Sequence, residues 1–237
     1  MDKNSNIYTF VFAIVMVTLI AGLLSYTATS LKPLQEKNVK AEKMQKILST
    51  IGVEVSREEA EASFATFIKG QLALKKDGTV DAASKAFELS LKKEVKKDAV
   101  DQRFPLYVAE KEGKTFYVIP LYGAGLWDAI WGYIALGEDK NTIIGANFDH
   151  KAETPGLGAE ITTDWFQAQF KGKTLLKDLN AGYVAGNFVS VKAIKGGAKA
   201  EDAHGVDAIS GGTITSDGVS DMVQERLARY LPYFKNN

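Results

Sequence analysis

The N-terminal part of the chain is a long apolar run. No charged side chain lies between Asn4 and Leu31, and residues 7–24 are almost wholly apolar. A helix needs roughly 20 such residues to cross the hydrocarbon core of a bilayer, where only a helix satisfies the backbone of a single segment. The pattern predicts a short N-terminus and one transmembrane anchor over residues 1–31.

A cleaved signal peptide is the alternative for this segment, with a weak cleavage site between Ala28 and Ser30. The apolar region of a signal peptide is normally about 7–15 residues long and follows a stronger positive cluster than Lys3 alone, so a retained anchor is favoured. Five lysines over residues 32–46 would by a positive-inside count keep the next segment in the cytoplasm. Large domains are translocated despite such charge, so the residues leave the orientation open.

Residues 32–103 carry a helical pattern. Apolar residues recur at three- and four-residue steps among lysines over 39–51, which predicts an amphipathic helix ending at Gly52. Residues 56–100 are rich in Ala, Glu and Lys, which predicts an accessory helical segment. Its expected buried positions are Phe64, Phe67, Ile68, Leu72 and Leu74.

From residue 104 onward the pattern changes to short strands separated by glycine turns. It predicts a hairpin of strands 104–110 and 115–121, strands at 131–136 and 142–148, a helix at 159–170, one long strand or a strand pair at 183–194, and a last helix over 217–231. One face of that helix should be buried, formed by Val219, Met222, Val223, Leu227, Tyr230 and Leu231. The fold class expected for 104–237 is α+β, a largely antiparallel sheet flanked by helices.

Composition excludes several classes of function. The 237 residues include 29 basic and 29 acidic side chains, and this zero net charge argues against nucleic acid as a partner. The absence of cysteine excludes disulfides, thiolate zinc sites, iron–sulfur ligation and cysteine nucleophiles. With His150 and His204 as the two histidines, no metal site is expected.

Residues 207–216 form the first of three segments that carry candidate chemistry. Gly211 and Gly212 permit close approach to the backbone, and a helix follows whose free N–H groups and dipole would favour a phosphate. A glycine turn followed by an ordinary Ser/Thr cap is the alternative, and the local pattern by itself favours it. The hydroxyl groups of the segment belong to Ser210, Thr213, Thr215 and Ser216.

The second segment is residues 153–158. Pro155 fixes its own φ, while Gly156 and Gly158 permit conformations closed to other residues, so a rigid exposed loop is expected before a helix. The alternative is a plain connector. The lysine and glycine spacing excludes a nucleotide P-loop.

The third segment is residues 122–128, in which a pair of glycines precedes Leu126 and Trp127. Large apolar groups beside flexible backbone would suit the border of a flat aromatic ligand. A bulged strand with a core tryptophan is an equally good explanation.

Taken together, the three segments resemble the FMN-binding domain of the C subunit of the sodium-translocating NADH:quinone reductase, a domain shared with the G subunit of the Rnf electron-transfer complex. The flavinylation signature of that family is an aspartate, a short spacer and Ser/Thr-Gly-Ala-Thr. Asp207, Ser210, Gly211 and Thr213 match it, whereas Gly212 replaces the usual alanine. The other two segments and the single N-terminal span match in order and separation, so the resemblance covers essentially the whole chain.

The resemblance implies FMN bound covalently by a phosphoester to Thr213, transferred from FAD by an FMN transferase. Thr213 would be an attachment point, and no catalytic residue is expected in this chain. Asp207 would be read by the transferase or would polarise the local hydroxyls. The expected cofactor contacts are Thr213, Ser210, Gly211, Gly212, Thr215, Asp207, Glu153, Thr154, Gly156, Leu157, Gly158, Leu126 and Trp127.

The function implied is that of an electron-transfer subunit within a sodium-pumping NADH:quinone oxidoreductase, active in the assembled complex. Its partners would be the other membrane and flavoprotein subunits, because no Gly-x-Gly-x-x-Gly fingerprint for NADH is present. The resemblance also implies a single-pass protein of the bacterial inner membrane with its soluble domain on the periplasmic side.

Three alternatives remain open from the sequence. One is a G-type subunit of an Rnf-like ferredoxin:NAD complex. Another is a membrane-anchored envelope binding module without flavin. The third is an anchored hydrolase using Ser210, which lacks the Gly-x-Ser-x-Gly elbow and a histidine paired with that serine by sequence.

Overall fold

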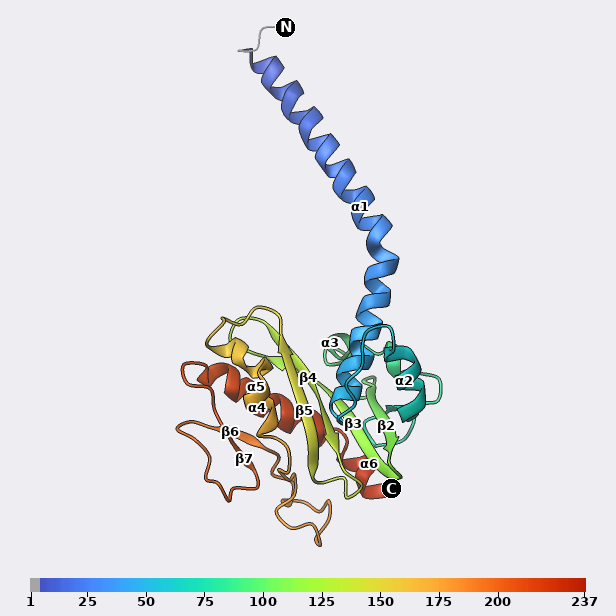
Figure 1. Ribbon diagram of the computed structural model, residues 1–237, viewed down its shortest axis with the longest axis vertical. Coiled ribbons are helices and arrows are strands. Elements are labelled where there is room, and N and C mark those ends of the chain that lie inside the picture. Colours follow the sequence, from blue (N-terminus) through green and yellow to red (C-terminus); the bar gives the residue numbers. More distant parts are fainter. Residues whose placement is uncertain (1–4) are drawn as a thin grey trace. The chain divides into compact units, whose positions relative to one another are not determined.

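The computed structural model describes residues 5–237, and the chain divides into two compact units, residues 1–43 and 44–237. Helix α1, Asn6–Ser49, supplies the described part of the first unit (Figure 1). Within the described residues it is the one helix long and apolar enough to cross a membrane. Its side chains are exposed from Thr9 to Lys40. Residues 1–4 of the expected N-terminus and anchor lie outside the described part.

The last turns of α1 belong to the second unit, and the helix is closed by a turn at Gly52, as predicted. Gly52 has φ 69°, its N–H donates to the carbonyl of Ser49, and the N–H of Val53 donates to that of Leu48. This pair of hydrogen bonds is the Schellman motif, which requires a left-handed residue at this position and so favours glycine. Pro33 lies inside the helix, which continues through it.

An antiparallel sheet of five strands forms the centre of the second unit, and each strand pairs with the next one in the chain. The predicted hairpin is confirmed, with a two-residue turn in which Glu112 and Gly113 both have positive φ, as a tight hairpin turn requires. The two following strands are also confirmed. The strands are β1 (Ile68–Leu74), β2 (Phe104–Lys111), β3 (Lys114–Ala124), β4 (Ala129–Leu136) and β5 (Ile143–His150).

Both faces of the sheet are covered. On one face, the end of α1 and helix α2 (Ala60–Phe67) pack against strand residues such as Val118. On the other face lies α5 (Thr213–Ala228), with the main core around Phe148 and Val219. Figure 1 shows α5 running across the sheet on the side that also carries α4 (Asp164–Ala168). The α+β class with a largely antiparallel sheet flanked by helices is therefore confirmed.

The prediction of an all-helical segment over residues 56–100 was wrong in its middle. Residues 68–74 form β1, an edge strand paired with β2, and Gly70 packs directly against Val108. Their Lys, Gln and Ala content favours helix locally, but pairing in the sheet overrides that preference. Shorter helical turns follow at η1 (Ala86–Glu88) and α3 (Leu91–Glu94).

The expected strand or strand pair over 183–194 was also wrong. Only β6 (Lys192–Ile194) is a strand, and it pairs in parallel with β7 (Gly205–Asp207). Positive φ angles at Gly182, Gly186 and Ser190 interrupt the extended conformation.

The helix predicted at 159–170 is present as two short pieces, η2 (Gly158–Thr162) and α4, which the extended residue Thr163 separates. The last helix begins four residues earlier than predicted, at Thr213, and a separate helix α6 (Leu231–Asn236) follows it. The predicted apolar face is buried except for Leu231, which is half-buried.

Candidate functional site

Thr213 is the first residue of α5 and is half-buried; Ser210 and Gly211 before it are exposed, and Gly212 between them and Thr213 is buried. Gly211 has φ 74°, a left-handed conformation that suits glycine. The fully buried Ser216 holds this loop, because its hydroxyl accepts from the N–H of Ile209 at 3.0 Å and donates to the carbonyl of Gly212 at 3.0 Å. The loop therefore presents the Thr213 side chain from a fixed backbone.

Glu153 joins the three candidate segments. Its Oε1 accepts from the backbone N–H of Trp127 at 3.0 Å, and its Oε2 accepts from the hydroxyl of Thr215 at 2.6 Å. Its own N–H donates to Nδ1 of His150. The residue is 5% exposed, so these hydrogen bonds are shielded from water. A single buried carboxylate thus fixes the 125–128 hairpin loop and the first turn of α5 against the 153–158 loop.

The pKa of Glu153 reflects this environment. Burial by itself raises the pKa of a carboxyl group. The hydrogen bonds from Thr215 and from the backbone of Trp127 and Asp128, with His150 nearby, outweigh burial and hold the pKa below its ordinary value. The group is therefore ionised at neutral pH.

Glycines at the same junction allow the segments to meet. A Cβ atom at Gly158 would collide with Oε2 of Glu153 and with the Thr215 hydroxyl, and one at Gly125 would lie 2.5 Å from Oε1 of Glu153. A Cβ atom at Gly212 would lie 3.0 Å from the carbonyl carbon of Leu157. The glycine that replaces the usual alanine of the family signature thus accompanies a close backbone contact.

The three segments enclose a cavity of about 310 Å³, here called the loop cavity. This volume falls at the lower end of the roughly 300–1,000 Å³ of small-molecule sites. Its lining combines exposed apolar side chains with the Thr213 residue and the Glu153 carboxylate. The lining residues are Leu126, Trp127, Glu153, Thr154, Leu157, Gly158, Gly211, Gly212, Thr213, Ile214 and Thr215.

A second cavity of about 520 Å³ lies at the other side of Thr213 and is here called the turn cavity. Asp207 stabilises one of its walls, because Oδ1 accepts from the N–H of Ala198 at 2.7 Å. The backbone N–H of Asp207 donates to Oε1 of Gln169. The lining residues are Trp165, Lys195, Gly196, Gly197, Asp207, Ala208, Ile209, Ser210, Gly211 and Thr213.

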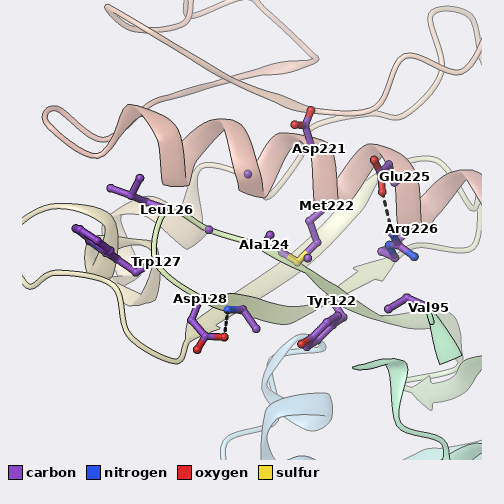
Figure 2. A pocket seen from close by; sticks show the side chains of 14 residues that line it. Val95, Tyr122, Ala124, Leu126, Trp127, Asp128, Asp221, Met222, Glu225 and Arg226 are labelled. Atoms are coloured by element: carbon purple, nitrogen blue, oxygen red, sulfur yellow. Dashed lines mark hydrogen bonds and ion pairs between the residues drawn. The ribbon is translucent and has the colours of Figure 1, made fainter. Parts of the chain in front are cut away.

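The largest of these spaces, about 590 Å³, is a groove between α5 and the end of β3, here called the helix groove. In Figure 2, Leu126 and Trp127 lie at its hairpin end, and Asp221, Met222, Glu225 and Arg226 come from α5. Thr213 is not among its lining residues. Its acidic groups include Asp128, which pairs with Lys151, and Glu225, which pairs with Arg226. Residues 5–237 contain no cluster of three or more His, Asp or Glu that could hold a metal ion.

The structure brings together most of the residues expected at the site. Ten of them line the loop cavity, while Ser210 and Asp207 line the turn cavity. Gly156 lines neither, and its N–H donates to Glu160 within its own loop. The core alternative for Trp127 is wrong, since the residue is 67% exposed.

Other residues of the site were missed in the sequence. Ile214 follows Thr213 and was overlooked because polar residues surround it. Trp165 and Lys195, which line the turn cavity, lie in segments with no recognisable motif, so nothing in the linear pattern marked them. The two histidines give no support to a hydrolase using Ser210, because His150 accepts from Glu153 and His204 contacts Thr174.

Comparison with known proteins shows which family this chain resembles. The model of the family described as "FMN-binding domain" matches residues 125–228. The C subunit of the Na(+)-translocating NADH-quinone reductase of Vibrio anguillarum is 31% identical over 92% of this chain and 89% of its own. The corresponding subunit of Pasteurella multocida is 32% identical, and the match covers 93% of this chain and 89% of the relative.

Solved structures lead to the same family. The crystal structure of the C subunit of the Na(+)-translocating NADH-quinone reductase from Parabacteroides distasonis has a TM-score of 0.77 and 39% identity, covering 87% of this chain and 98% of that one. The crystal structure of Shewanella oneidensis NqrC has a TM-score of 0.69 and 29% sequence identity, and the match covers 84% of this chain and 99% of that one.

Fold, loop cavity and family model define a protein with an FMN-binding domain. At this identity and coverage, the chain belongs to the family formed by the C subunits of the Na(+)-translocating NADH-quinone reductases.

Proposed function

We propose that this chain carries FMN joined through its phosphate to the hydroxyl of Thr213 and passes electrons within a sodium-translocating NADH-quinone reductase. The observation that supports this most directly is the position of Thr213. It is half-buried at the start of α5, on a loop fixed by Ser216, and lines two cavities. A hydroxyl in this setting is accessible to a transferase yet rigidly placed.

The attachment requires an outside enzyme and donor, an FMN transferase and FAD. The Thr213 oxygen forms a bond to the FMN phosphorus, the pyrophosphate P–O bond of FAD breaks, and AMP and a proton leave. The residue itself would not act in the later electron transfer. Bound FMN supplies the redox chemistry, and the protein supplies its position and environment.

The loop cavity suits the flat ring system of the flavin. Leu126, Trp127 and Ile214 expose 48%, 67% and 60% of their surface although they are large and apolar. Exposed apolar groups gathered around a cavity are typical of a ligand site. Glu153 holds the walls of this cavity in place and would adjoin the ring as a fixed negative charge.

The partners proposed are the other membrane and flavoprotein subunits of the complex, with α1 as a single-pass anchor in the bacterial inner membrane. Support comes from the exposed apolar surface of α1 and from the relatives, whose names make them subunits of a reductase. The soluble domain is proposed to lie on the periplasmic side.

One experiment tests attachment and anchoring together. The full chain is produced with an FMN transferase, membranes are separated, and denaturing gels are examined for flavin fluorescence and by intact mass. Wild type should give a fluorescent band in the membrane fraction, and Thr213→Val should lose it completely. Thr213→Ser, which keeps a hydroxyl, is the matched control and should retain label. A fluorescent band from Thr213→Val would refute the attachment, and so would an intact mass of wild type equal to that of the chain without FMN. A fluorescent wild-type chain found in the soluble fraction would refute the anchor.

A further inference from the structure

Thr213 lies between two cavities that differ in charge. Gly211 and Thr213 line both, so the segment between Ser210 and α5 separates the loop cavity from the turn cavity. The loop cavity carries the ionised Glu153 and no cation among its lining residues. The turn cavity carries Lys195 together with Asp207. Among the residues that line these two cavities, Lys195 is the one cation.

Lys195 reaches this position through the pairing of β6 with β7. The two strands are parallel, with Ile194 opposite Asp207, so their carboxyl ends lie at the same edge. The chain then turns, with the N–H of Gly197 donating to the carbonyl of Ile194 and Asp207 accepting from Ala198. Consecutive positive φ angles of 86° and 99° at Gly196 and Gly197 make this turn possible. Lys195 is exposed and makes no ion pair within the part of the chain that the structure describes.

A flavin attached at Thr213 contains two chemically different parts. The ring system is flat and largely apolar, whereas the phosphodiester at the attachment point carries one negative charge. That charge would be repelled by Glu153 in the loop cavity, where no lining cation offsets it. In the turn cavity it would meet Lys195, the one cation that lines either space.

We propose that the turn cavity is the phosphate side of the cofactor site, where the Lys195 ammonium pairs with the phosphodiester on Thr213 while the ring occupies the loop cavity. This inference rests on the proposed function. It assigns the binding of a phosphate ester to Lys195, which lies outside the three motifs.

The first test measures the rate at which FMN is incorporated. Full-length wild type, Lys195→Met, Lys195→Arg and Lys192→Met are incubated with transferase and FAD, and intact mass is followed with time. Lys192 is the matched control, because it is also exposed, lies three residues earlier and lines neither cavity. Lys195→Met should be about five-fold slower at low salt, as expected for loss of one exposed charge pair, whereas Lys195→Arg and Lys192→Met should match wild type. In about 1 M salt, where the screening length is roughly 3 Å, the difference should shrink.

A rate alone would not distinguish phosphate binding from contact with the transferase. The second readout is therefore the ³¹P resonance of the attached phosphodiester after each variant has been fully loaded. It should move in Lys195→Met and stay at the wild-type position in Lys192→Met. An unmoved resonance in Lys195→Met would overturn the inference, whatever the rate. If wild type itself gains no FMN mass, the proposed function fails instead.

Discussion

The two walls around Thr213 are built in different ways. The wall of the loop cavity depends on Glu153, whose hydrogen bonds reach 26 residues back to Trp127 and 62 residues forward to Thr215. The wall of the turn cavity depends on Asp207, which binds the N–H of Ala198 only nine residues away. One wall is thus fixed by buried contacts between distant segments, and the other by a local turn beside a short parallel strand pair. Loss of the first should affect the whole domain, and loss of the second should affect mainly the site.

The largest effect is expected from Glu153→Ala. Removal of this carboxylate leaves the buried Thr215 hydroxyl and the Trp127 N–H without their acceptor, each costing about 1–3 kcal/mol. The free energy of unfolding should fall by about 3 kcal/mol in urea titration, and FMN incorporation should fall with it. Glu160→Ala, which removes a single hydrogen bond to Gly156 in the same loop, is the control and should cost under about 1 kcal/mol. Equal losses in the two variants would contradict the central role of Glu153.

A smaller loss of stability with a selective effect on the site is expected for Asp207→Ala. One hydrogen bond to Ala198 is lost, which costs about 1 kcal/mol. Asp202→Ala is the matched control, since Asp202 accepts similarly from the N–H of His204 and lines neither cavity. Both variants should lose similar stability, but only Asp207→Ala should slow FMN incorporation by the transferase. If Asp202→Ala slowed it equally, the turn wall would have no specific role.

The smallest effect concerns pH. The folded-state pKa of Glu153 lies below its ordinary value of 4.5. A depressed carboxyl pKa contributes stability that is present above the unfolded pKa and is lost as pH falls through the folded one. The melting temperature of wild type should therefore fall more steeply below pH 4.5 than that of Glu153→Gln, and the two profiles should run parallel near pH 7. Parallel profiles through the acid range would show that the hydrogen bonds of Glu153 do not depend on its charge.

Much of the architecture could be predicted from the sequence because the relevant signals are local. The apolar run of α1, the left-handed Gly52 at its end and the hairpin of β2 with β3 each depend on residues near one another in the chain. The three glycine-containing segments could also be recognised, since glycine is needed wherever a Cβ atom would block close approach. Their spacing and order indicated the family.

Tertiary structure decided what neighbouring residues could not. The composition of residues 68–74 favours a helix, but they form a strand because they pair with β2. By sequence, the loop that contains Glu153 could have been a plain connector. In the fold, the Trp127 N–H and the Thr215 hydroxyl donate to its two carboxylate oxygens. Lys195 came to Thr213 only through the parallel pairing of β6 with β7. Secondary-structure preference and the need for glycine at a tight turn depend on residues close together in the chain. The charge and hydrogen-bond partners of a residue depend on which distant segments the fold places together.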